Sequence, residues 1–155
     1  SHSKTEMEVI KELASNDKSY RSLTQSWFKN SPLLEIIQQA ARLGFKLIIT
    51  TDHGTINVKN PSKVIGDKNT SLNLRYKTGK SLTYEDKEVL AAKDPKAISL
   101  PTINMSSSFI FAKGDYFFAY PNNYNHYVSY YRNTYQHGGV SLEEMIIPFS
   151  VLTPK

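Results

Sequence analysis

The stretch FKLIITTDHG, residues 45–54, decides how this chain is interpreted. Residues 45–50 form a short apolar run that directly follows a helical pattern, which predicts a buried strand of an α/β sheet. Residues 51–54 (TDHG) then stand at the carboxyl end of that strand, where open α/β sheets bind their ligands. Because Gly54 lets the chain turn away, we expect the side chains of Asp52 and His53 to project over the edge of the sheet.

The patterns on either side of this stretch predict a mixed α/β domain. Apolar residues at helical spacing, a Ser-Pro start and a Thr-x-x-Asp capping pair indicate helices over residues 4–14, 20–28, 32–43 and 83–92. Two aromatic runs around a Lys-Gly-Asp turn predict a β-hairpin over residues 109–120. We expect loop or edge structure over the Tyr- and Asn-rich residues 122–135, a capping box at residues 141–144, and a last strand over residues 146–152.

Composition limits the chemistry. The 155 residues are enough for one domain with a real core, and 39% hydrophobic and 21% charged residues indicate a globular chain. The chain has no cysteine, so a metal ion would need His and carboxylate ligands. A net charge of +5 favours anionic partners such as phosphate or nucleotides, although a basic surface alone would account for it. No apolar run is long enough to insert in a membrane, and no signal peptide is visible.

Three side chains stand out as metal ligands. Asp52 and His53 offer a carboxylate and an imidazole, both suitable for zinc, and an ordinary polar turn is the alternative interpretation. His137 precedes Gly138 and Gly139, which permit an unusual turn, and alone it would be interpreted as a solvent-exposed turn histidine. More than 80 residues separate His53 from His137. If the three side chains serve one two-metal site, they should lie within roughly 8 Å of one another.

Other conspicuous residues have simpler explanations. His126 lies among tyrosines, which favours a surface or packing role. The tyrosines around it could stack on nucleic-acid bases or pack against a sheet. Glu144 is explained by the capping box, and Glu143 is a favourable charge at a helix N-terminus.

The two segments that carry the candidate ligands resemble a known family. TTDHG after an apolar strand, and QHGGVSLEEMIIP at residues 136–148, are similar to the two C-terminal signatures of the PglZ domain of the alkaline phosphatase superfamily. The similarity is nearest to PglZ domains of the PorX class of response regulators, which belong to the type IX secretion system. It implies an alkaline-phosphatase-like layered α/β sheet with flanking helices. Residues 1–155 would form a single fragment, the C-terminal portion of that domain.

The resemblance also implies a ligand set and an activity. Two zinc ions would hydrolyse phosphate esters, in particular phosphodiesters of the nucleotide type, with Asp52 and His53 on one ion and His137 on the other. His2 stands where the His of an upstream Asp-x-x-x-His motif is expected, unless Ser1-His2-Ser3 is an expression scar. The family's nucleophile and its remaining ligands cannot be assigned here. The fragment alone should therefore be inactive, or nearly so.

Partners and location also follow from the resemblance alone. It implies a phosphate-ester or oligonucleotide substrate, signalling proteins of the secretion system as partners, a cytoplasmic location and no membrane insertion. A homodimer is compatible with it. The alternative function is a non-catalytic binding or signalling module built on the same fold.

Overall fold

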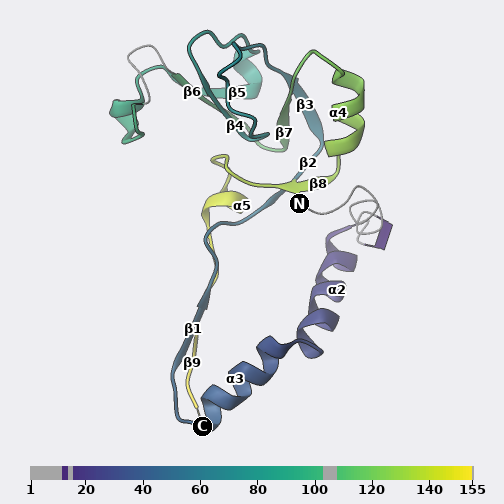
Figure 1. Cartoon of the computed structure of the whole chain (residues 1–155), viewed down its shortest axis with the longest axis vertical. Coiled ribbons are helices and arrows are strands. Elements are labelled where there is room, and N and C mark those ends of the chain that lie inside the picture. The colour runs from purple at the N-terminus through teal and green to yellow at the C-terminus, as the bar shows by residue number, and fades with distance from the viewer. Residues whose placement is uncertain (1–11, 14–15, 103–107, 155) are drawn as a thin grey trace. The chain divides into compact units, whose positions relative to one another are not determined.

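The structure is a computed structural model that describes residues 12–13, 16–102 and 108–154 (Figure 1). It has the mixed α/β architecture that the sequence predicts, with helices and several small sheets. The chain divides into two compact units. The terminal unit comprises Ser1–Thr50 and Pro148–Lys155, and the central unit comprises Thr51–Ile147.

Two helices form the first part of the terminal unit, as the sequence predicts. Helix α2 spans Asp17–Lys29, and the side chain of its N-cap residue Asn16 accepts a hydrogen bond of 2.9 Å from the backbone N–H of Ser19. Helix α3 spans Pro32–Arg42, with proline in its first turn where no backbone N–H is needed. Neither helix has a buried residue, so their apolar side chains are at least partly exposed.

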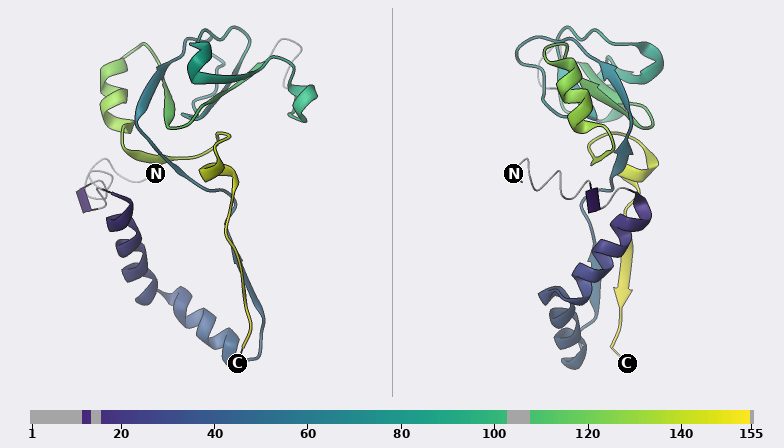
Figure 2. Two further views of the ribbon diagram at one scale, coloured as in Figure 1. Left: turned by 180° about the vertical axis from the view of Figure 1, so that it is seen from behind. Right: turned by 90° about the vertical axis from the view of Figure 1, so that its right-hand side faces the viewer.

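The remainder of the terminal unit is a two-stranded antiparallel ribbon. Strand β1 (Leu47–Thr50) pairs with strand β9 (Phe149–Leu152), and Figure 2 shows the ribbon from two sides. The predicted strand is therefore present, but its predicted burial is wrong because Ile48 is 59% exposed. Among the described residues, β9 is its one strand partner, so the apolar run lacks the neighbouring strands that would bury it.

The central unit contains seven strands in three small sheets within the residues that the structure describes. Strand β2 (Ile56–Val58) pairs antiparallel with β8 (Thr134–Gln136), and β3 (Asn60–Lys63) pairs parallel with β7 (Tyr116–Ala119). Strand β6 (Ser108–Ala112) lies between β4 (Tyr76–Gly79) and β5 (Val89–Ala92), antiparallel to both. The helices of this unit are the 3₁₀ turns η1 (Asp86–Glu88) and η2 (Pro95–Ile98) and the α-helices α4 (Tyr124–Tyr131) and α5 (Leu142–Met145).

Strand β6 is buried from Phe109 to Ala112. Phe109 and Phe111 point to one face and pack with Ala92, while Ile110 and Ala112 point to the other face and pack with Val64, Val89 and Phe118. Both faces are covered, which explains why SFIFA is apolar without alternation.

Three local predictions are wrong. Residues 109–120 do not form a hairpin, because β4 and β5 occupy both edges of β6 and β7 pairs with β3 instead. Residues 83–92 are not a helix, since only η1 is helical and the rest of the segment includes β5, which pairs with β6. Most of residues 122–135 is helical, because Tyr124, Val128 and Tyr131 recur at helical spacing and pack on a common core.

Two further predictions concern the ends of the chain. Most of the predicted helix over residues 4–14 lies outside the residues that the structure describes. The predicted last strand is present in part: β9 spans Phe149–Leu152 and begins after Pro148, so residues 146–147 lie outside it. Within the described ranges, no helix combines the length and apolar character that a membrane crossing requires.

Candidate metal centre

The pairing of β2 with β8 brings the two predicted ligand segments together. Ile56 is paired with Gln136, so the residues just before β2 lie opposite those just after β8. The backbone N–H of Gly54 donates a hydrogen bond of 2.8 Å to the carbonyl oxygen of Glu144. A Cβ atom on Gly54 would lie 2.0 Å from the carbonyl oxygen of Glu143, so only glycine permits this approach of two backbones.

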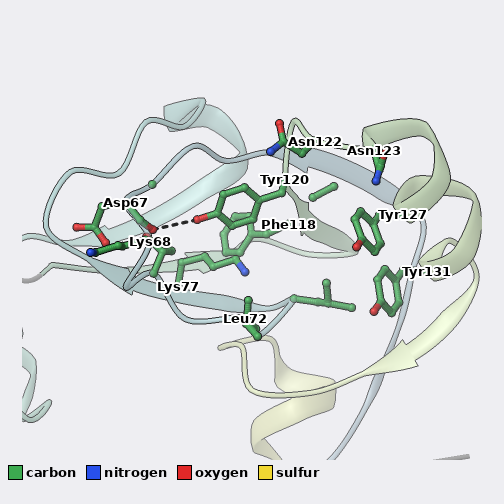
Figure 3. A pocket seen from close by; sticks show the side chains of 14 residues that line it. Asp67, Lys68, Leu72, Lys77, Phe118, Tyr120, Asn122, Asn123, Tyr127 and Tyr131 are labelled. Atoms are coloured by element: carbon green, nitrogen blue, oxygen red, sulfur yellow. Dashed lines mark hydrogen bonds between the residues drawn. The ribbon is translucent and has the colours of Figure 1, made fainter.

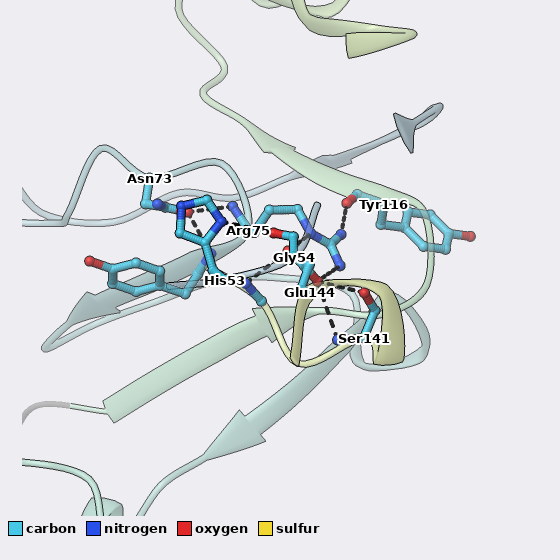
Figure 4. Close-up of polar contacts among 9 residues, drawn as sticks. His53, Gly54, Asn73, Arg75, Tyr116, Ser141 and Glu144 are labelled. Carbon is cyan, nitrogen blue, oxygen red and sulfur yellow. Dashed lines mark hydrogen bonds and ion pairs between the residues drawn. The ribbon is translucent and has the colours of Figure 1, made fainter. Parts of the chain in front are cut away.

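This approach places the rings of His53 and His137 in contact. Their centroids are 3.7 Å apart and the ring planes differ by 10°, so the imidazoles are stacked. Nδ1 of His53 lies 2.9 Å from the carbonyl oxygen of Gly54. Since a carbonyl can only accept, Nδ1 carries the hydrogen, and Nε2 of the neutral ring is left with the lone pair that a metal would need. Figure 4 shows His53 beside the buried polar contacts that support it.

Asp52 completes the predicted trio. Its Oδ1 lies 3.7 Å from Nε2 of His53, and its side chain is 85% exposed. A hydrogen bond from its own backbone amide and the nearby His53 ring both lower the pKa of the Asp52 carboxyl below its usual range. The group is therefore ionised at neutral pH, as a metal-binding carboxylate must be.

A buried ion pair fixes the turn that carries His137. The guanidinium of Arg75 donates to both carboxylate oxygens of Glu144, at 2.9 and 2.8 Å, and the two side chains are 0% and 1% exposed (Figure 4). The same carboxylate accepts hydrogen bonds from the backbone N–H groups of Gly139 and Ser141 and from the Ser141 hydroxyl. The predicted capping box is thus confirmed, and its glutamate also holds Gly139, two residues after His137.

Electrostatics keep Glu144 charged in this buried position. Burial raises the pKa of its carboxyl, but the hydrogen bonds from Arg75, Ser141 and Gly139 outweigh it, so the pKa lies below its usual value. Arg75 also donates to the carbonyl oxygen of Tyr116, which ties the pair to strand β7. The support of the His137 turn is therefore a charge-paired and hydrogen-bonded network.

The chemistry of these side chains fits a metal ion in part. Two ligand atoms bound to one tetrahedral zinc stand roughly 3.3–3.6 Å apart, close to the 3.7 Å between Asp52 and His53. Among the described residues, however, no group of three or more His, Cys, Asp or Glu residues is arranged to hold one ion. His53 lies beside both Asp52 and His137, and metal binding stays a prediction.

Three other residues that the sequence analysis considered lie outside the candidate metal centre or outside the described residues. His2 lies outside the described residues. His126 is exposed on α4, where its ring contacts Tyr127 and Tyr130, so its predicted surface role is confirmed. Glu143 is exposed in the first turn of α5, which agrees with its predicted role as a helix-terminal charge.

Sequence reasoning missed two residues of the central unit. Arg75, the partner of Glu144, and Lys77, a second buried cation, lie in a segment whose pattern gave no regular period. The capping box alone accounts for Glu144 in the sequence. Nothing in the sequence therefore indicated that a cation 69 residues away would bind its carboxylate.

Comparison with known families agrees with the resemblance of the two signatures. No individual curated protein matches the chain. Residues 1–152 match the family described as the BREX system PglZ alkaline phosphatase-like domain. The match covers nearly all of the 155 residues and includes both units and all four histidines. The chain therefore belongs to the PglZ family of alkaline phosphatase-like domains.

Proposed function

We propose that this chain supplies part of a zinc-dependent phosphoesterase centre, with Asp52 and His53 as ligands of one ion and His137 as a ligand of a second. The observation that carries the proposal is the stacking of His53 on His137 beside the Asp52 carboxylate. His53 and His137 are 84 positions apart in the sequence, and their contact adds little to the core, since the three side chains are at least partly exposed. Convergent exposed ligands are typical of a site.

Each residue has a distinct task in this proposal. Asp52 and His53 hold one ion, and the hydrogen bond from Nδ1 of His53 to the Gly54 carbonyl orients the ring. The Glu144 network holds the turn of His137 in place. Paired zinc ions supply charge neutralisation at a transferring phosphoryl group. The positive net charge of the chain favours an anionic substrate, for which we propose a phosphodiester of the oligonucleotide type.

We further propose that the rest of a PglZ domain completes this centre. His2 would be an additional ligand, and the nucleophile would come from a segment of the domain other than these 155 residues. The exposed apolar side chains of α2, α3, β1 and β9 support this proposal, because a larger α/β domain would cover them. In this proposal the domain serves a cytoplasmic response regulator of the PorX class and interacts with signalling proteins of the type IX secretion system.

Zinc titration of this chain tests the ligand assignment. We expect calorimetry to show zinc binding that weakens at least tenfold in His53→Ala and in His137→Ala. His126→Ala is the matched control, because it removes an exposed histidine of the same unit that the site does not use. Equal zinc affinity in His137→Ala and the parent chain would contradict the assignment.

Activity separates the enzyme from the alternative module. The longer PglZ protein should hydrolyse a model phosphodiester in a chelator-sensitive manner, and Asp52→Asn should reduce kcat/KM at least a hundredfold. Zinc binding without any turnover in the longer protein would instead favour a non-catalytic binding module. Robust turnover by the 155 residues alone would show that the nucleophile lies within them.

A further inference from the structure

The central unit has a pocket on the face of the sheet that is turned away from the candidate metal centre. Its volume is about 540 Å³, within the range of small-molecule sites (Figure 3). Strand β4 separates the two places. Tyr76 packs against the same buried cluster as Val140 and lies beside Gly138, whereas the next residue, Lys77, lines the pocket. Successive residues of a strand point to opposite faces, so the pocket is distinct from the ligands Asp52, His53 and His137.

Lys77 is a buried lysine in the lining of this pocket. Its residue is only 2% exposed, and its Nζ donates one hydrogen bond of 2.7 Å to the carbonyl oxygen of Ser71. The ammonium lies 5.4 Å from the ring centroid of Tyr120. Within the part of the chain that the structure describes, it forms no ion pair with a carboxylate. Burial alone lowers the pKa of Lys77 to about 8.

A buried cation without a counter-charge points to a ligand. An ammonium has three donors, and the Ser71 carbonyl uses one of them. Burying such a charge unpaired is costly, whereas Arg75 in the same unit is matched by Glu144. An anionic group beside Lys77 would accept the remaining hydrogens and supply the missing charge.

The opposite wall of the pocket is aromatic. Tyr127 and Tyr131 stand on successive turns of α4, with ring centroids 6.2 Å apart and planes that differ by 14°. Leu72 and Leu74 add apolar surface, and the side chains of Asn122 and Asn123 lie at the same pocket (Figure 3). Parallel aromatic rings with amides nearby are suited to a planar ring that carries polar edges.

We propose that this pocket binds a small organic anion with a planar ring, such as a nucleoside monophosphate, whose anionic group contacts Lys77 and whose ring lies against Tyr127 and Tyr131. The proposal is independent of the metal centre and of any hydrolysis there. It assigns Lys77 to ligand binding and α4 to recognition of the ring.

Calorimetric titration of the full chain with adenosine monophosphate, in the presence of EDTA, tests the proposal. We expect saturable binding that weakens at least tenfold in Lys77→Met, while the matched variant Lys80→Met, which alters an exposed lysine of the same segment, binds like the parent. Adenosine lacks the anion and ribose 5-phosphate lacks the ring, so each should bind at least tenfold more weakly. The parent chain without zinc and His53→Ala should bind the nucleotide equally well.

A second variant guards against a folding artefact. Tyr127 is 39% exposed, so Tyr127→Ala should fold normally and should weaken adenosine monophosphate severalfold without changing the affinity for ribose 5-phosphate. Lys77→Met should also retain the thermal midpoint of the parent, because it removes a buried charge. The proposal is overturned if the parent does not bind adenosine monophosphate, or if Lys77→Met binds it as tightly as the parent does.

Discussion

Arg75 and Glu144 form a buried ion pair in the central unit. Arg75 and Glu144 bind one another through two hydrogen bonds, and each has further partners in the protein. Removing one member of such a pair leaves a buried charge without compensation, which costs far more than the pair contributes when intact. The pair therefore makes the turn after His137 sensitive to single substitutions.

Glu144→Gln tests this sensitivity. We expect it to lower the free energy of unfolding by about 3–5 kcal/mol, measured by urea denaturation, because Arg75 stays buried while the carboxylate that held it and Gly139 is lost. Glu143→Gln is the matched control, since the neighbouring carboxylate is exposed and its loss should change the stability by less than about 0.5 kcal/mol. Equal stabilities of the two variants would contradict a structural role of the pair.

The same pair predicts how stability depends on pH. The pKa of folded Glu144 lies below its ordinary value of 4.5, so the unfolded chain binds this proton more readily than the folded one. The contribution of Glu144 is thus complete above about pH 4.5 and is lost as the pH falls through the lower folded pKa. Unfolding of Glu144→Gln should accordingly depend less on pH in this acid range than unfolding of Glu143→Gln does.

At the scale of elements, close backbone contact between residues 53–54 and α5 aligns the candidate ligands. Gly54→Ala should destabilise the chain by about 1–3 kcal/mol, because the new methyl group would collide with the Glu143 carbonyl oxygen. It should also weaken zinc binding, since His53 would move away from His137. Gly114→Ala is the control: its Cβ meets nothing within 4 Å, so only the cost of its positive φ, about 1 kcal/mol, is expected. Unchanged zinc affinity in Gly54→Ala would mean that this contact does not align the rings.

Sequence patterns predicted those elements that local chemistry determines. The helices α2 and α3, the capping box at Ser141 and the strand before Asp52 have their own start signals or period. The elements that were predicted wrongly depend on partners distant in the sequence. Strand β7 pairs with β3 and not with its sequence neighbour β6, and β5 is a strand because it pairs with one edge of β6. No local pattern records which edge is available.

The candidate site shows the same division. TDHG and HGG are recognisable as short segments, and their resemblance to the PglZ signatures predicts that Asp52, His53 and His137 serve one site. The support of the site was not predictable, because Arg75 appears in the sequence as an ordinary basic residue among 19, and the same holds for Lys77 in the separate pocket. Their burial is a property of the assembled central unit.

At the scale of the whole molecule, the two units differ in how well their own residues cover them. The central unit has three buried clusters that contain Ile56, Val64 and Phe109 among others. The terminal unit has large apolar side chains in the open: Trp27 is 60% exposed, Ile36 62% and Phe149 66%. Apolar exposure on this scale is typical of a surface that contacts another protein or another segment of the same protein.

Hydrogen exchange distinguishes what covers the terminal unit. In the 155-residue chain at low concentration, amides of α2, α3, β1 and β9 should exchange at least tenfold faster than those of β6, because short helices and a two-stranded ribbon without a buried face are marginal in water. In the longer PglZ protein that we propose, the same amides should become protected, while β6 changes little and serves as the internal control. Protection that instead appears in the 155-residue chain as its concentration rises would assign the apolar surface to a homodimer. Equal protection of both units at low concentration would contradict either form of cover, since it would mean that the terminal unit is stable with its apolar side chains exposed.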